Sequence, residues 1–301
     1  MPTLIIYSLV FLGQLILADY LRTMGIVAFV IVVGLVLALL YIISGFLYST
    51  YLSTKIVLNY LFRHHINRYL IIRNLKPDYK QILDGTFYYY HTLNSKNKRL
   101  FEKRVQKFMD SKTFIAAGEL KEVTPQMKTL ISASAVQLTF GLPGVYFKHF
   151  EDIHVHPDYY YSEGMKQFNA GEVHKSGLIM LSWRDFVEGY VHTDNGRNVG
   201  LHEMAHALRL ENMIKNEEYG YFDWDDIQLF NDYTVEESNK IIAGTETIFR
   251  PYAAVHYQEF FAVLIEVFFE QPKLLLDYHP DLFAVTTRLL RQNPIDPNVR
   301  I

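Results

Sequence analysis

The sequence predicts an α+β fold, in which a mostly helical domain with a small sheet is preceded by one or two transmembrane helices. Three observations lead to this prediction. A run of 32 residues near the N-terminus carries no formal charge. Beyond it lie segments whose apolar residues recur at helical spacing, and short segments rich in β-branched and aromatic residues. These candidate strands are set among the helices without regular βαβ alternation, which is typical of α+β proteins.

Residues 1–54 are predicted to be a membrane anchor. Thr23–Thr54 is the uncharged run, and it is longer than the ~20 apolar residues that cross a bilayer. A second uncharged run, Thr3–Ala18, is separated from it by Asp19 and Arg22. No Lys or Arg precedes that second run, so the basic start of a secretory signal is missing. We expect residues 23–54 to span the membrane, while residues 3–18 form a second span, an interfacial segment or a weak signal.

Residues 55–80 are predicted to be a basic juxtamembrane helix. They contain a single acid, Asp78, and six basic residues: Lys55, Arg63, Arg68, Arg73, Lys76 and Lys80. Because positively charged flanks stay in the cytoplasm, we expect an inner (cytoplasmic) membrane protein whose remaining residues are cytoplasmic. Zero cysteines exclude a disulfide scaffold and a thiolate metal site. The net charge of −3 shows no nucleic-acid footprint, so no nucleic-acid partner is expected.

Residues 81–301 are interpreted as one domain, because no internal repeat, low-complexity tract or linker follows residue 80. Helices are predicted at Ser95–Met109 and at Thr124–Leu138, the latter opened by a Thr cap and Pro125. Two further helices are predicted, one around residues 198–212 and one over Pro251–Phe269. Val173–Trp183 is a candidate edge strand whose free backbone groups could align an extended peptide. An ordinary core strand is the equal alternative.

The segment "NVGLHEMAHALRLEN", residues 198–212, contains the motif H-E-x-x-H. On a helix, His202 and His206 project from one face, one turn apart, so both imidazoles could bind one Zn²⁺. Glu203 points sideways and can hold a metal-bound water as general base. The alternative is a pair of ordinary histidines on an amphipathic helix.

A catalytic zinc also needs a third protein ligand and one open position. The extended motif H-E-x-x-H-x-x-G-x-x-H is absent, because Arg209 and Asn212 occupy its Gly and last His positions. The apolar helix "RPYAAVHYQEFFAVLIEVFFEQP" offers Glu259 and Glu266, and a buried carboxylate needs a cation or a donor. We expect Glu259 to be the ligand and Glu266 a supporting carboxylate, with His256 as the competing ligand.

Tyr252 is a candidate oxyanion donor. It lies seven residues before Glu259, so on a continuous helix it would share that face, about 10 Å along the axis. Its phenol could then donate a hydrogen bond to an oxyanion forming on a scissile carbonyl. The chain has 22 tyrosines, so a packing role is the alternative.

Taken together, these segments resemble the Mlc titration factor A family of zinc-dependent peptidases, whose catalytic region is similar to that of anthrax lethal factor. The resemblance runs from about Phe87 to Pro294. It is carried by "YYYHTLNSKNKRLFEKRVQKFM", "FEDIHVHPDYY", "GLIMLSW", "DNGRNVGLHEMAHAL" and "YQEFFAVLIEVFFEQPKLLLDYHPDLF". It implies a zincin-like domain over residues 81–301, one Zn²⁺ per chain, and peptide or protein substrates. For the site it implies three ligands, His202, His206 and Glu259, with Glu203 as base and Tyr252 as oxyanion donor.

Two departures from the family pattern stand out. Many relatives have an Asp three residues after the second His, where this chain has Arg209. The hydrophobic N-terminus is also unlike that of the soluble members, so their partners, including a transcriptional repressor, need not transfer. The predicted function is a membrane-anchored zinc metallopeptidase. The alternative is a non-catalytic, membrane-tethered regulator that binds a protein partner with the same fold.

Overall fold

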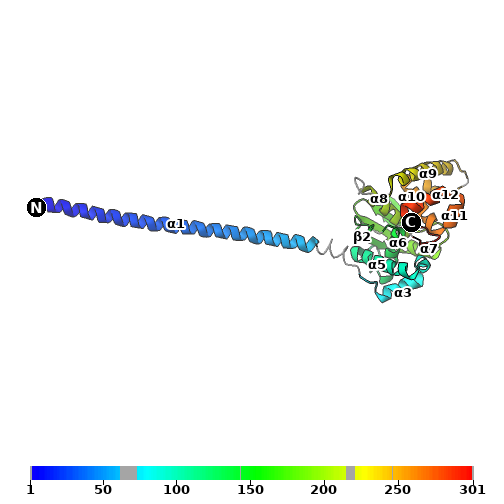
Figure 1. The fold of residues 1–301 in the computed structure, drawn as a ribbon, viewed down its shortest axis with the longest axis horizontal. Helices are drawn as coiled ribbons and strands as arrows, with labels where there is room; N and C mark the ends of the chain where they lie inside the picture. Colours follow the sequence, from blue (N-terminus) through cyan, green and yellow to red (C-terminus); the bar gives the residue numbers. More distant parts are fainter. Residues whose placement is uncertain (1, 62–72, 143, 215–220, 246, 300–301) are drawn as a thin grey trace. The chain divides into compact units, whose positions relative to one another are not determined.

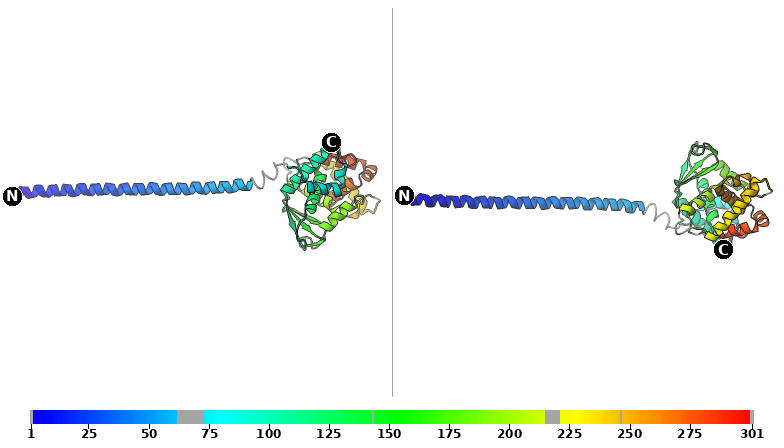
Figure 2. Two further views of the ribbon diagram at one scale, coloured as in Figure 1. Left: turned by 90° about the horizontal axis from the view of Figure 1, so that it is seen from below. Right: turned by 90° about the horizontal axis from the view of Figure 1, so that it is seen from above.

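The computed structural model describes residues 2–61, 73–142, 144–214, 221–245 and 247–299 (Figures 1 and 2). The chain divides into two compact units, Met1–Asn67 and Arg68–Ile301. Each unit is described by itself.

The N-terminal unit is one long helix, α1 (Pro2–Leu61), drawn in blue in Figure 1. Its part from Val10 to Lys55 is long and apolar enough to cross a membrane. The helix continues through Asp19 and Arg22, where the Thr23 hydroxyl donates a hydrogen bond to the Asp19 carbonyl (2.7 Å). The two uncharged runs therefore belong to one continuous helix.

The predicted basic helix over residues 55–80 lies partly outside the described residues, because 62–72 are not among them. Residues 55–61 belong to α1, whereas residues 73–76 are not helical. A separate helix, α3 (Pro77–Thr86), begins at Pro77, and the preceding Lys76 is extended (φ −63°, ψ 147°). A proline disfavours helical conformation at the residue before it, which explains why no helix runs through this point.

The second unit is mostly helical, and two of its predicted helices begin at residues whose side chains cap them. The Asn94 side chain accepts hydrogen bonds from two backbone N–H groups at the start of its helix, and Thr124 accepts one from Met127. The helices are α4 (Tyr88–Thr92), α5 (Ser95–Ser111), α6 (Pro125–Thr139), α7 (Trp183–Val191), α8 (Val199–Ile214), α9 (Trp224–Ile242), α10 (Tyr257–Glu270), α11 (Pro272–Tyr278) and α12 (Pro280–Leu290).

A small sheet completes this unit and confirms the α+β prediction. Its strands are β1 (Thr113–Ala116), β2 (Asp152–His156), β6 (Leu178–Ser182) and β5 (Gly171–His174), in that order. The first three are parallel, and β5 pairs antiparallel with β6 at the edge. A separate hairpin joins β3 (Tyr160–Ser162) to β4 (Gln167–Asn169).

The stretch Val173–Trp183 is therefore not one strand. It holds the end of β5, a turn and the whole of β6. Gly177 has a φ of 96°, a conformation that glycine adopts readily, and this permits the reversal between the two strands. The edge position belongs to β5, while β6 lies inside the sheet.

The predicted helix over Pro251–Phe269 is also divided in two. Residues Pro251–Ala254 form a short 3₁₀-helix, η2, and α10 begins at Tyr257. Between them His256 is extended (φ −158°, ψ 149°), and its Nδ1 accepts a hydrogen bond from the Gln258 N–H (3.3 Å). This side-chain cap ends the continuity of the helix, so the argument that Tyr252 shares a helical face with Glu259 was wrong.

Helix α8 packs against α10, α6 and the edge strand β5. Its apolar residues Leu201, Met204, Ala205 and Leu208 are buried, as expected for a core helix. The packing of α8 against both α10 and β5 places the polar side chains of one helix face between a carboxylate-bearing helix and a sheet edge.

Candidate metal centre

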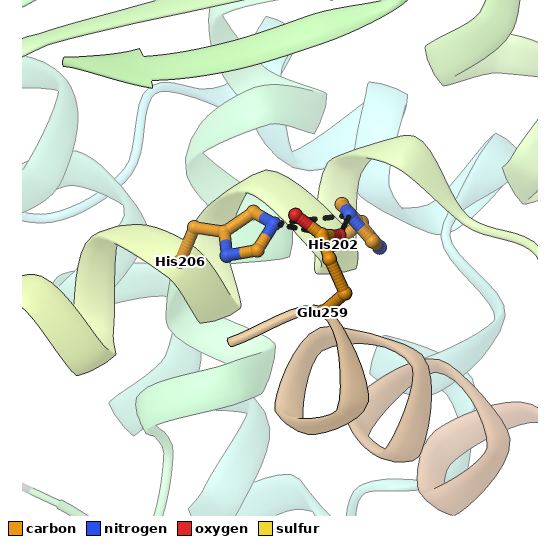
Figure 3. Close-up of side chains that lie close together, drawn as sticks. All are labelled: His202, His206 and Glu259. Atoms are coloured by element: carbon orange, nitrogen blue, oxygen red, sulfur yellow. Dashed lines mark hydrogen bonds and ion pairs between the residues drawn. The ribbon is translucent and has the colours of Figure 1, made fainter. Parts of the chain in front are cut away.

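Three predicted ligands come together at the contact between α8 and α10 (Figure 3). His202 and His206 project from α8, and Glu259 projects from the first turn of α10. The Nε2 atoms of His202 and His206 lie 3.1 Å apart. The Glu259 Oε2 atom lies 3.1 Å from Nε2 of His202 and 3.4 Å from Nε2 of His206. Two nitrogens and one oxygen therefore converge on one point.

The electrostatics of this cluster favour a positive charge at its centre. Burial lowers the pKa of His202, but hydrogen bonds with Glu259 and Glu266 outweigh it and raise the pKa to about 10. Burial raises the pKa of Glu259, yet its hydrogen bonds with both histidines bring it well below the ordinary value. A divalent metal would supply such a charge, and two imidazoles with a carboxylate form a donor set that suits zinc. The residues present therefore fit a metal ion.

Glu266 supports His202 from the side opposite to the cluster. Its Oε1 lies 2.5 Å from Nδ1 of His202. Arg250 donates to both carboxylate oxygens of Glu266 (2.7 and 2.8 Å), and the Asn198 backbone N–H donates to Oε2 (2.9 Å). Such a partner fixes the orientation of a metal-binding imidazole and leaves Nε2 free for the metal. Glu266 was predicted as a supporting carboxylate, whereas Arg250 has no local sequence signal.

Glu203 lies beside the edge strand rather than among the three converging side chains. A Cβ atom added to Gly171 of β5 would lie 2.4 Å from both Cγ and Oε1 of Glu203, so the carboxylate rests directly on this glycine. Glu203 is buried, and burial raises its pKa, while His202 and His206 lower it. A carboxyl group whose pKa is raised above its ordinary value is better suited to accept and return a proton.

Tyr252 reaches the cluster from η2, although not by the predicted route. Its ring centroid lies 6.0 Å from that of His202. Burial, together with the charge and a hydrogen bond of Glu259, raises the pKa of Tyr252 to about 12. The phenol therefore keeps its proton at neutral pH. His256, the competing ligand, caps α10 and is not one of the clustered residues.

Two hollows meet at this centre. The smaller, of about 170 Å³, is lined by Gly171, Glu172 and Val173 of the edge strand and extends along α8 past His206. The larger, of about 550 Å³, extends toward Arg250 on the other side. Both are lined by His202, Glu203 and Tyr252, so the two hollows share walls at the cluster, and together they are called the cleft below.

Two histidines on α8 and a carboxylate on α10 thus form a candidate metal site. The model of one family, described as glucose-regulated metallo-peptidase M90, matches residues 62–291. The match covers most of the chain and contains every residue of the cluster. The chain belongs to this metallopeptidase family.

Individual relatives agree with this assignment. An uncharacterized protein of Synechocystis is 26% identical over 242 residues, which cover 75% of this chain and 88% of the relative. Mlc titration factor A of Edwardsiella ictaluri is 27% identical over 208 residues, or 61% of this chain and 76% of the relative. Mlc titration factor A of Pectobacterium atrosepticum is 26% identical over 136 residues, which cover 43% of this chain and 51% of the relative. The family resemblance predicted from the motifs is confirmed.

Proposed function

We propose that the protein is a membrane-anchored, zinc-dependent peptidase. The observation that carries the proposal is the convergence of His202, His206 and Glu259 beside an edge strand, with Glu203 close by. The family's name supports a metal-dependent peptidase in general terms. The choice of zinc rests on the donor set of two imidazoles and one carboxylate.

Each residue of the site would have a separate role in peptide hydrolysis. Zn²⁺ held by the three ligands would lower the pKa of a water molecule and polarise a carbonyl. Glu203 takes the proton from the attacking water and later passes it to the leaving amine. Tyr252 donates a hydrogen bond to the carbonyl oxygen as that oxygen becomes negative. Strand β5 pairs with an extended substrate through its free backbone groups, as a sheet edge can.

We further propose that the peptidase domain is on the cytoplasmic side of the inner membrane. Six basic residues and one acid follow the apolar run, between Lys55 and Lys80. Positive flanks are retained in the cytoplasm. Reporter fusions placed after residue 80 should therefore give a cytoplasmic signal. A periplasmic signal would contradict the orientation and would change the class of accessible substrates.

A second candidate function is a non-catalytic regulator that is tethered to the membrane and binds a protein partner. Relatives named Mlc titration factor A support it, because that name describes titration of another factor rather than hydrolysis. The presence of Glu203 beside the ligands favours catalysis, because binding alone needs no general base.

Metal analysis combined with digestion of a peptide library tests both candidates. The purified full chain should hold about one zinc, and His202→Ala or Glu259→Ala should lose most of it. Glu203→Gln should keep the zinc and hydrolyse nothing, because it removes the base and leaves the ligands. Full zinc retention in Glu259→Ala would disprove the third-ligand assignment. A zinc-loaded wild-type protein that cleaves no peptide would favour the regulator.

A further inference from the structure

Arg209 is a cation in the active-site cleft for which the proposed mechanism has no role. It follows His206 by three residues on α8, on the helix face that carries both histidines. It lines the smaller hollow together with His206 and the edge strand. Although it borders this hollow, only 8% of its surface is exposed.

The contacts of the Arg209 guanidinium are aromatic or weakly polar. Its central carbon lies 5.4 to 5.8 Å from the centroids of three rings, those of Phe230, Phe261 and Tyr257. Its one hydrogen bond to a described residue joins Nη2 to Oδ1 of Asn231 at 3.4 Å. Its Nε is buried and has no partner. Within the described ranges, no carboxylate oxygen lies within 4.0 Å of its nitrogens.

A buried cation with unused donors is unfavourable unless something compensates it. Burial accordingly lowers the pKa of Arg209, and the Tyr257 phenol offsets only part of that effect. The aromatic faces contribute a further part. These rings do not replace hydrogen-bond acceptors, and the guanidinium carries five N–H donors in a fixed plane that need them. Among the described residues no anion pairs with the guanidinium, and the side of Arg209 that is open faces the cleft.

We propose that Arg209 is the anion-recognition residue of the cleft and binds a carboxylate of the peptide substrate, either at its C-terminus or on an acidic side chain. The proposal rests on the proposed function, because it assumes that peptides occupy this cleft. A planar carboxylate matches the guanidinium fork with two parallel hydrogen bonds.

The surroundings favour a singly charged carboxylate over a phosphate. The hollow is small, about 170 Å³, and Glu172 and Glu259 also line it, so a dianion would meet stronger repulsion. The Glu172 carboxylate lies 3.0 Å from Nε2 of His174. Lys175 lines the same hollow and adds a second positive charge.

Paired peptides test this proposal directly. Each pair differs by Glu against Gln at one position, or by a free against an amidated C-terminus. Binding is measured to the zinc-loaded, full-length Glu203→Gln protein, which should not cleave the probes, and kcat/KM is measured with the wild type. The charged member should be preferred about tenfold to a hundredfold, as expected for hydrogen bonds to a charged group. The position of the effect distinguishes a side-chain from a C-terminal carboxylate.

Arg209→Gln should abolish this preference, so that the charged and the neutral member of each pair bind equally. Arg99→Gln, which removes a positive charge from the exposed face of α5, is the matched control and should keep the preference. Arg209→Lys keeps the charge but not the fork, so it should retain only part of the preference. If Arg209→Gln does not fold, the preference of the wild type and that of Arg209→Lys still test the proposal.

The possible results distinguish failure of the Arg209 proposal from failure of the peptidase proposal. Hydrolysis without any preference for the charged members would overturn the role of Arg209 and leave the peptidase proposal standing. Selective binding without hydrolysis by the wild type would do the reverse. Tighter binding of a phosphoserine peptide than of its Glu counterpart would overturn the carboxylate assignment, and absence of binding by every peptide would overturn both.

Discussion

Gly171→Ala should impair the chemistry while leaving the metal and the fold intact. The added Cβ would lie 2.4 Å from Cγ and Oε1 of Glu203, whereas ordinary contact begins at 3.4 Å. The carboxylate must therefore retreat by about 1 Å. The three nearest atoms all belong to the Glu203 side chain and none to a backbone, so the side chain must move from Cγ outward while the backbone can stay in place. A misplacement of about 1 Å can lower the rate about a hundredfold.

The assay compares kcat, bound zinc and thermal stability of the Gly171→Ala and wild-type proteins. A fall of about a hundredfold in kcat is expected, with zinc content and melting temperature near those of the wild type. Gly164→Ala is the matched control, because its added Cβ would meet no heavy atom closer than 3.9 Å. A Gly171→Ala enzyme with unchanged kcat would show that the position of Glu203 against β5 does not matter for catalysis.

Three further predictions follow from contacts of the same site. Tyr252→Phe should lower kcat by about 10²–10³ with little change in KM or zinc content, and steady-state kinetics would disprove the oxyanion role if kcat stayed constant. Glu266→Gln should weaken zinc binding by about 10- to 100-fold in a chelator competition, because His202 loses its orienting acceptor; equal affinity would contradict that role. Burial raises the pKa of Glu270 from 4.5 to about 7, so the unfolded state releases its proton first and stability should fall between about pH 4.5 and 7. That loss is of the order of 3 kcal/mol and should be absent in Glu270→Gln, as denaturant melts at pH 5 and pH 8 would show.

Local patterns in the sequence were sufficient to predict which three side chains lie together, namely those of His202, His206 and Glu259. His202 and His206 are one helical turn apart, and that spacing fixes their common face wherever the helix packs. Glu259 was predictable because a carboxylate in an apolar helix needs a counter-charge. The division of the chain near Pro77 could also have been predicted, since proline restricts the residue before it.

Other features of the site depend on contacts between residues far apart in the sequence. The contact of Gly171 with Glu203 joins a strand edge to a helix, and neither segment alone indicates it. Arg250 meets Glu266 because η2 turns back along α10, and that reversal depends on His256 acting as a cap. Tyr252 does lie near His202, but the argument for this rested on a continuous helix that does not exist. Proximity came from the chain reversal instead.

The ligands come from helices that are far apart in the chain, with His206 on α8 and Glu259 on α10. An ion bound to both would act as a removable cross-link that closes about 50 residues into a loop. By the loop-closure relation for cross-links, this closure would stabilise the fold by about 4 kcal/mol. The supply of zinc would then determine how long each molecule resists proteolysis, as well as its activity. Because metal-free molecules would be degraded sooner, the remaining molecules would mostly contain zinc.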